Sequence, residues 1–232
     1  HAFWPRLQLG LSVEKSLATL SNSDIPTSRA VLYSRYVLLH GSSLYLQPFE
    51  YVEGFGVIQN RGLPDPRLST PGTDLFRDRT AVGVHYHKNM MTPYWDAEGG
   101  YSIDMTYQYG LPIFGTDRSF QQVYGQFAYV KGLAPLRDVV GEGPVRNWLA
   151  DTRVALRIGG AAAVPSNGQF FALGGGDNFR GFDLYERQGS LLWVGSVEWR
   201  VPLATNLPWD VCDHFAGVRN IYVAPFYDVG ND

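Results

Sequence analysis

An arginine in a glycine-rich stretch carries the most distinctive chemistry in this sequence. Three glycines over 174–176 precede the triplet Arg180-Gly181-Phe182, and a strongly alternating segment follows over 190–202, with Glu198 on its polar face. A guanidinium is planar, always charged and binds carboxylates through a rigid fork of N–H donors. By its pattern alone, Arg180 is typical of a solvated arginine on a flexible loop.

Other residues that could do chemistry form weaker patterns. His85 and His87 share a strand face and could begin a metal site, but their ordinary interpretation is polar residues that face an interior, so no metal is expected. Asp104, Asp151 and Glu198 could suggest the carboxylate pair of a glycoside hydrolase, yet nothing in their spacing selects two of them. The glycine run lacks the GK[ST] of a phosphate loop, and no G-x-S-x-G elbow or triad order is found.

The composition suits a β-rich chain and excludes several classes of function. Of 232 residues, 14% are aromatic and 18% charged, and the net charge is −3, so no nucleic-acid partner is expected. Cys212 is the single cysteine, which excludes an intrachain disulfide and a cysteine-based zinc knuckle, and we interpret it as a free thiol without a role. No apolar run approaches the length of a membrane helix, although strands of about ten alternating residues also cross membranes.

Alternation of apolar and polar residues predicts strands along the whole chain and no convincing amphipathic helix. Roughly nine or ten strands are expected, at residues 3–14, 28–39, 43–53, 55–60, 80–88, 101–109, 119–130, 148–158, 190–202 and 220–230. Residues 16–27 are expected to form a turn or loop, because they contain Asn22, Asp24 and Pro26.

Two features favour a membrane barrel over a soluble β-sandwich or barrel, whose strands also alternate. Many segments exceed the about five or six residues of an ordinary strand and are long enough to cross a bilayer. Charges on the polar faces would point into a cavity, whereas Tyr and Trp near strand ends on the opposite faces would suit the membrane interfaces. We therefore expect an all-β fold, an antiparallel transmembrane β-barrel.

Several motifs in order resemble the Omp85 superfamily, the outer-membrane barrels that insert or translocate other proteins. GGGDNFRGF at 174–182 resembles the conserved loop of the family, VEWRVPL at 197–203 the strand after it, and APFYDVG at 224–230 the next strand. Residues 96–109 are similar to a further strand of these barrels. The resemblance covers residues 80–232 well and the first third by pattern only, and points to the BamA- and TamA-like bacterial surface antigens.

The resemblance implies a sixteen-stranded barrel preceded by POTRA domains, of which residues 1–232 would be an incomplete part. No POTRA-like pattern precedes Phe3, and the last strands are absent from the sequence, so we expect further segments or another chain to close the barrel. Unpaired backbone at an open edge would otherwise face lipid at a cost of several kcal/mol per group.

The resemblance also implies that the loop over 160–189 folds into the barrel lumen, where its arginine meets acidic residues on the inner wall. The loop-motif residues are Gly174, Gly175, Arg180, Gly181 and Phe182. Glu198 and Asp228 alternate with apolar neighbours and can face the lumen, so we expect Arg180 to pair with one or both. The glycines would let the backbone turn tightly and pass close to the wall.

The function implied by the resemblance is the assembly, insertion or translocation of proteins at the outer membrane, without a cofactor or a chemical step, and so not as an enzyme. The expected partners are the lipid bilayer, unfolded outer-membrane or secreted proteins, and accessory lipoproteins or periplasmic proteins. Two alternatives stay open: a barrel that anchors or exports a lipase-like passenger domain, and a soluble β-rich binding module. Sequence preceding His1 would separate assembly from export, because POTRA repeats favour the first and a hydrolase domain the second.

Overall fold

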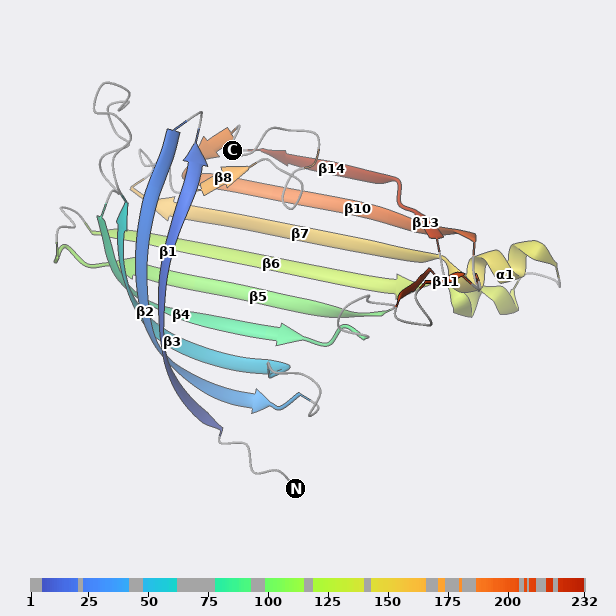
Figure 1. The fold of residues 1–232 in the computed structure, drawn as a ribbon, viewed down its shortest axis with the longest axis horizontal. Helices are drawn as coiled ribbons and strands as arrows, with labels where there is room; N and C mark the ends of the chain where they lie inside the picture. The colour runs from blue at the N-terminus through green and yellow to red at the C-terminus, as the bar shows by residue number, and fades with distance from the viewer. Residues whose placement is uncertain are drawn as a thin grey trace.

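A single antiparallel sheet of ten strands dominates the fold (Figure 1). The computed structural model describes residues 6–20, 23–41, 48–61, 78–92, 99–114, 119–139, 143–165, 171–173, 180, 187–204, 207, 209–211, 216–218 and 221–231. The strands are β1 (Leu7–Leu20), β2 (Ser23–Leu39), β3 (Glu50–Arg61), β4 (Asp78–Asn89), β5 (Gly99–Gly110), β6 (Phe120–Gly132), β7 (Arg153–Val164), β10 (Leu191–Ala204), β13 (Ile221–Val223) and β14 (Phe226–Asn231). Each strand from β1 to β7 pairs with the next, β10 pairs with β7, and β13 and β14 both pair with β10.

Short elements lie at the two ends of this sheet. The hairpin of β8 (Phe171–Leu173) and β9 (Arg187–Gly189) follows β7 at one end. The helices η2 (Ala134–Asp138) and α1 (Pro144–Asp151), with the hairpin of β11 (Trp209–Val211) and β12 (Ala216–Val218), lie at the other end (Figure 1). Neither helix in the described part of the chain has the length and apolar character needed to cross a membrane.

One face of the sheet is apolar and exposed, and we call it the outer side. Large apolar side chains are exposed on all ten strands: examples are Leu9, Leu32, Ile58, Val84, Met105, Phe127, Ile158, Trp193, Val223 and Val229. Leu9 is 76% exposed, and Met105, in the middle of β5, is 51% exposed. Soluble monomers rarely expose an apolar patch of more than about a few hundred Å², so this face suits contact with lipid chains.

The polar side of the sheet is its concave side. The sheet curves along its strand order (Figure 1), and its polar side chains shield one another: Glu53 is 9% exposed and Ser196 is 8% exposed. Two small apolar clusters also lie on this side, near the end of the sheet that carries β8: Val57, Ala81 and Phe120, and Ala161, Leu192 and Val194. The usual distribution of polar and apolar residues is therefore inverted, with charges inside and hydrocarbon outside.

Two glycines on the concave side allow aromatic rings to lie flat against the wall. Gly83 is the register partner of Phe55, and Gly110 is the register partner of Phe120. A Cβ atom at Gly110 would overlap the ring of Phe120, and one at Gly83 would meet the ring of Phe55 at 2.5 Å. Each ring therefore occupies the space that a side chain on the neighbouring strand would fill.

The all-β antiparallel class predicted from alternation is confirmed, whereas some predicted boundaries are wrong. Residues 16–20 and 23–27, predicted as a turn or loop, belong to β1 and β2, which stay paired as far as Leu20 and Ser23. Pro26 is tolerated because it lies beyond the part of β2 that pairs with β3, at an edge where its missing N–H removes no bond to β3. The predicted strands over 43–53 and 55–60 are one strand from Glu50, and 43–47 lie outside the described residues.

Three further boundaries differ near the C-terminal half. Trp148 belongs to α1 and not to a strand, because Pro144 favours the first helical turn and Thr152 Oγ1 ends the helix by donating to the Trp148 carbonyl at 2.8 Å. The segment over 220–230 is divided into β13 and β14 by Ala224 and Pro225. The predicted loop over 160–189 begins later, since residues 160–164 complete β7.

The inverted arrangement predicts that a lysine on the apolar side of β5 lowers the stability of the protein more than a lysine on its polar side. Met105→Lys, on the apolar side, should lower the free energy of unfolding in lipid vesicles by about 2–4 kcal/mol, because it places a charge near the bilayer centre. Gln108→Lys, on the polar side of the same strand, is the matched control and should lower it by only about 1 kcal/mol, the cost of the hydrogen bond from Gln122 that it removes. Denaturant titration of tryptophan fluorescence measures both, and equal losses would contradict the assignment of the two faces.

Candidate functional site

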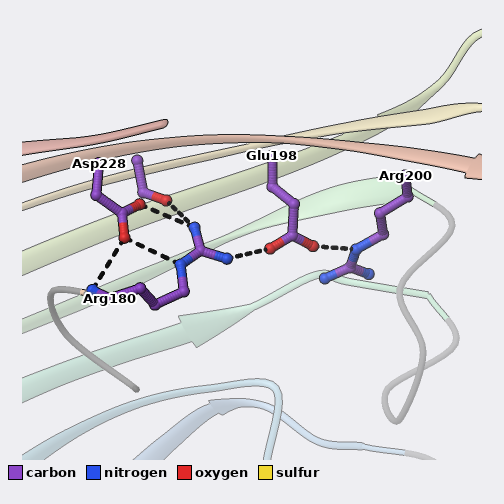
Figure 2. A network of polar contacts seen from close by, with 5 residues as sticks. Arg180, Glu198, Arg200 and Asp228 are labelled. Atoms are coloured by element: carbon purple, nitrogen blue, oxygen red, sulfur yellow. Dashed lines mark hydrogen bonds and ion pairs between the residues drawn. The ribbon is translucent and has the colours of Figure 1, made fainter. Parts of the chain in front are cut away.

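Arg180 lies on the concave side of the sheet and forms a bidentate ion pair with Asp228 of β14 (Figure 2). Its Nε donates to Asp228 Oδ2 at 2.9 Å, and its Nη2 donates to Asp228 Oδ1 at 2.8 Å. Its backbone N–H also donates to Asp228 Oδ2, at 3.1 Å. The aspartate therefore holds both the side chain and the main chain of Arg180, which fixes the residue in position and orientation.

The rest of the guanidinium is bound by β10. Its Nη1 donates to Glu198 Oε2 at 2.7 Å, and its Nη2 donates to Ser196 Oγ at 2.8 Å. Glu198 also accepts a hydrogen bond from Arg200 Nε at 2.6 Å, through its other carboxylate oxygen (Figure 2). Two guanidinium groups and two carboxylates thus alternate in one chain of contacts, so the formal charges within the network cancel.

Strand register explains why these side chains meet. Ser196, Glu198 and Arg200 are two residues apart on β10 and therefore share a face. Ser196 lies opposite Asp228 in the pairing of β10 with β14, and Glu198 lies opposite Phe226. The guanidinium carbon of Arg180 lies 3.6 Å from the centre of the Phe226 ring, which adds a cation–π contact beneath the ion pairs.

Burial makes the pairing of Arg180 with Asp228 strong. The Asp228 side chain is 4% exposed, whereas that of Arg180 is 22% exposed. A buried carboxylate without a partner is costly, so Asp228 depends on the arginine. The hydrogen bonds to Asp228, and after them those to Glu198, raise the pKa of the Arg180 guanidinium further above its usual range. Lysine carries a single point of charge and could not reproduce these contacts to Asp228, Glu198 and Ser196 together.

The structure brings together Arg180, Glu198 and Asp228, the residues predicted to form the tether. The other loop-motif residues, Gly174, Gly175, Gly181 and Phe182, lie outside the described residues, as does Cys212. Sequence reasoning did not identify Ser196 as a partner or Phe226 as the ring beneath the guanidinium. Only the register of β10 with β14 reveals both, and a two-residue spacing from Glu198 was the one signal for Ser196.

The other candidates lie elsewhere on the concave wall. His85 and His87 of β4 contact Asp104 of β5. Asp104 and Glu198 are carried by β5 and β10, which are separated in the sheet by β6 and β7, about 14 Å at ordinary strand spacing. Asp151 is the last residue of α1, beyond the strands. Asp104 and Glu198 are therefore too far apart to form the carboxylate pair that the hydrolase interpretation would require.

Two further groups of polar contacts continue this wall. Arg35 Nη2 of β2 lies 2.8 Å from Glu53 Oε2 of β3. Gln122 on β6 donates to Gln108 on β5, and Tyr124 donates to Gln126 at 2.7 Å. Hydrogen-bonded side chains therefore line the concave side from β2 to β14, and Arg180 binds at one edge of this lining.

Removing the arginine should destabilise the protein mainly through the carboxylate it leaves behind. Arg180→Ala is expected to lower the free energy of unfolding by about 3 kcal/mol, because Asp228 is then buried without its partner. Arg180→Lys should recover less than half of that loss, since the bidentate contact is not restored. Equilibrium unfolding of the purified protein in detergent, followed by tryptophan fluorescence, measures both values.

A double-mutant cycle supplies the control. Asp228→Asn alone and Arg180→Ala alone should each destabilise, and the double variant should lose markedly less than the sum of the two. Strict additivity would mean that the two side chains do not stabilise each other in solution, contrary to the geometry described above.

Comparison with known families gives this network a context. The profile of the Omp85 superfamily domain matches residues 16–232, nearly the whole chain and the whole of the sheet from late β1 onward. A search of curated proteins finds no match. The motif that supplies Arg180 and the strands that supply Glu198 and Asp228 all fall inside the matched region. An antiparallel sheet with an apolar outer side, an arginine bound on its inner side and a match over this length together show that the chain belongs to the Omp85 superfamily.

Proposed function

We propose that this protein assembles, inserts or translocates other proteins at the outer membrane, as the superfamily to which it belongs does in general. The match over residues 16–232 carries the proposal. Its expected location is the outer membrane, as a multi-pass barrel to which these strands contribute. A BamA- or TamA-like role is the more specific form of the proposal.

The tether of Arg180 supports this role by placing part of a loop inside the hollow of the sheet. The loop leaves from β7 and returns to β10, and its arginine binds β10 and β14. One bound residue thus holds the loop on two strands that pair with each other. Arg180, so fixed, would stay at the inner wall while a client protein folds or passes nearby.

The polar wall supports the same role. The N–H and C=O groups of an extended, unfolded protein need new partners when they leave water, and hydrogen-bonding side chains on β2 to β7 could supply them. The apolar outer side complements this polar wall, because it fits the acyl chains of the bilayer. Handling an unfolded client needs both surfaces, whereas it needs no covalent step, and we propose that the protein acts without a cofactor or catalysis.

The partners that fit this proposal are unfolded outer-membrane or secreted proteins as clients, the bilayer as solvent, and accessory lipoproteins or periplasmic proteins as helpers. None of them calls for the chemistry of an enzyme active site. The contacts expected with clients are main-chain hydrogen bonds and ion pairs, so recognition would depend little on client sequence.

Reconstitution tests the proposal directly. Liposomes that contain the full-length protein should accelerate the folding of a urea-unfolded outer-membrane barrel, compared with empty liposomes, when folding is followed by protease resistance and altered gel migration. Arg180→Ala should lose most of this acceleration, because the loop is no longer held on β10 and β14.

Lys131→Ala is the matched control, because it removes one exposed cation near the end of β6, outside the network. It should keep the activity of the natural protein. No acceleration with several different unfolded barrels would count against the assembly role. Transfer of a soluble protein into the liposome interior, without any effect on barrel folding, would favour export instead.

A further inference from the structure

Two histidines and an aspartate converge on the concave wall, away from Arg180. His85 and His87 are two residues apart on β4 and share a face, and Asp104 of β5 is the register partner of His87. His85 Nε2 lies 3.1 Å from both carboxylate oxygens of Asp104, and His87 Nδ1 lies 2.9 Å from Oδ2. One ligand atom from each side chain lies within 4.8 Å of the others.

This spacing is close to what a metal ion requires. Zn²⁺ binds imidazole nitrogen and carboxylate oxygen at about 2.0–2.2 Å, so two ligand atoms of a tetrahedral site lie about 3.3 Å apart. The distances of 2.9–3.1 Å from Asp104 to His85 and His87 are shorter by a few tenths of an ångström. The two histidine nitrogens lie within 4.8 Å of each other, so rotations of the side chains that bring all three separations to about 3.3 Å would admit an ion among them.

The two imidazole rings are already positioned by a buried tyrosine. Tyr51, which is 6% exposed, stacks on His87 with ring centres 5.0 Å apart and meets His85 edge to face at 5.5 Å. The guanidinium carbon of Arg35 lies over the Tyr51 ring, 4.0 Å from its centre. Ligands that are held by packing lose little conformational freedom on binding, which favours affinity.

The cluster is also accessible from the hollow. The side chains of His85, His87 and Asp104 are 20%, 18% and 37% exposed. A site with three protein ligands leaves at least one position for water or another ligand, which here would point away from the wall. Imidazole nitrogen with a single carboxylate selects first-row ions such as Zn²⁺, Co²⁺, Ni²⁺ and Cu²⁺ over Mg²⁺ and Ca²⁺, which prefer oxygen ligands.

We propose that His85, His87 and Asp104 bind one divalent first-row transition-metal ion and so join β4 to β5 on the inner wall. From the sequence alone, His85 and His87 could begin a metal site but are interpreted as polar residues facing an interior, because the third ligand appears only once β4 and β5 are aligned. In the geometry described, the histidine nitrogens donate hydrogen bonds to the carboxylate. An ion replaces those hydrogens, so each coordinating nitrogen gives up its proton to the other ring nitrogen or to solvent. The site is independent of the proposed assembly role.

Titration with Co²⁺ and Zn²⁺ tests the site. The tag-free, full-length protein is stripped with a chelator in detergent, and Co²⁺ binding is followed by visible absorption. We expect saturation at one ion per chain, displacement of Co²⁺ by Zn²⁺, and no displacement by Mg²⁺. His85→Gln, His87→Gln and Asp104→Asn should each weaken binding by at least about 10–100-fold, the loss typical for even an outer partner of a ligand.

His40→Gln is the matched control, since His40 follows β2 and lies outside the cluster, and it should bind as the natural protein does. Absence of saturable Co²⁺ binding would overturn the proposal, as would equal binding by His40→Gln, His85→Gln and His87→Gln. If the ligand variants fail to fold, imidazole proton signals of the natural protein decide. Two paramagnetically shifted histidines on addition of Co²⁺ support the site, and unshifted signals overturn it.

Discussion

Backbone hydrogen bonding between neighbouring strands is the constraint on which this structure depends. Lipid offers no partner for an N–H or C=O group, so a chain that meets acyl chains must satisfy these groups internally. Pairing here continues from β1 to β7 and on to β10, with one register shift, between Val37 and Leu39 of β2, and with each strand paired to its neighbour in sequence or, for β7, to β10. Among the described residues no pairing joins β1 to β13 or β14, so the sheet as described is curved but not closed. Once the ladder is set, the two-residue period sends hydrocarbon to one side and hydrogen-bonding groups to the other.

The ion pairs of Arg180 follow from that division. A charge on the concave side is partly removed from water, so its stability depends on nearby opposite charge and on well-directed hydrogen bonds. Asp228 supplies two acceptor oxygens, Glu198 supplies a second carboxylate, and Phe226 supplies the face of its ring. The pairing of β10 with β14 places all three. Arg180 therefore gains its position from the sheet, while its contacts with β10 and β14 link these two strands.

Alternation alone predicts most of this sheet because the strands are long and two-sided. The segment over 101–109, for example, falls within β5 (Gly99–Gly110), since nothing in it competes with the period of two. Prediction fails where a local signal and long-range pairing disagree: Pro26 suggested a loop, but strand pairing continues past it to Leu20 and Ser23. The tether residues could be named because a loop motif resembled a known family. Asp104 could not be joined to the histidines in the same way, because the alignment of β4 with β5 depends on a hairpin whose length the sequence does not fix.

The glycines opposite Phe55 and Phe120 affect how far these rings extend into the hollow of the curved sheet. Because positions 83 and 110 have no Cβ, the ring of each phenylalanine lies over the glycine of the neighbouring strand. The volume of the ring is therefore part of the wall and does not extend into the hollow. A methyl group at either position would displace the ring from this place and push it toward the hollow. Phe55 and Phe120 therefore form part of the surface of the wall and do not project from it.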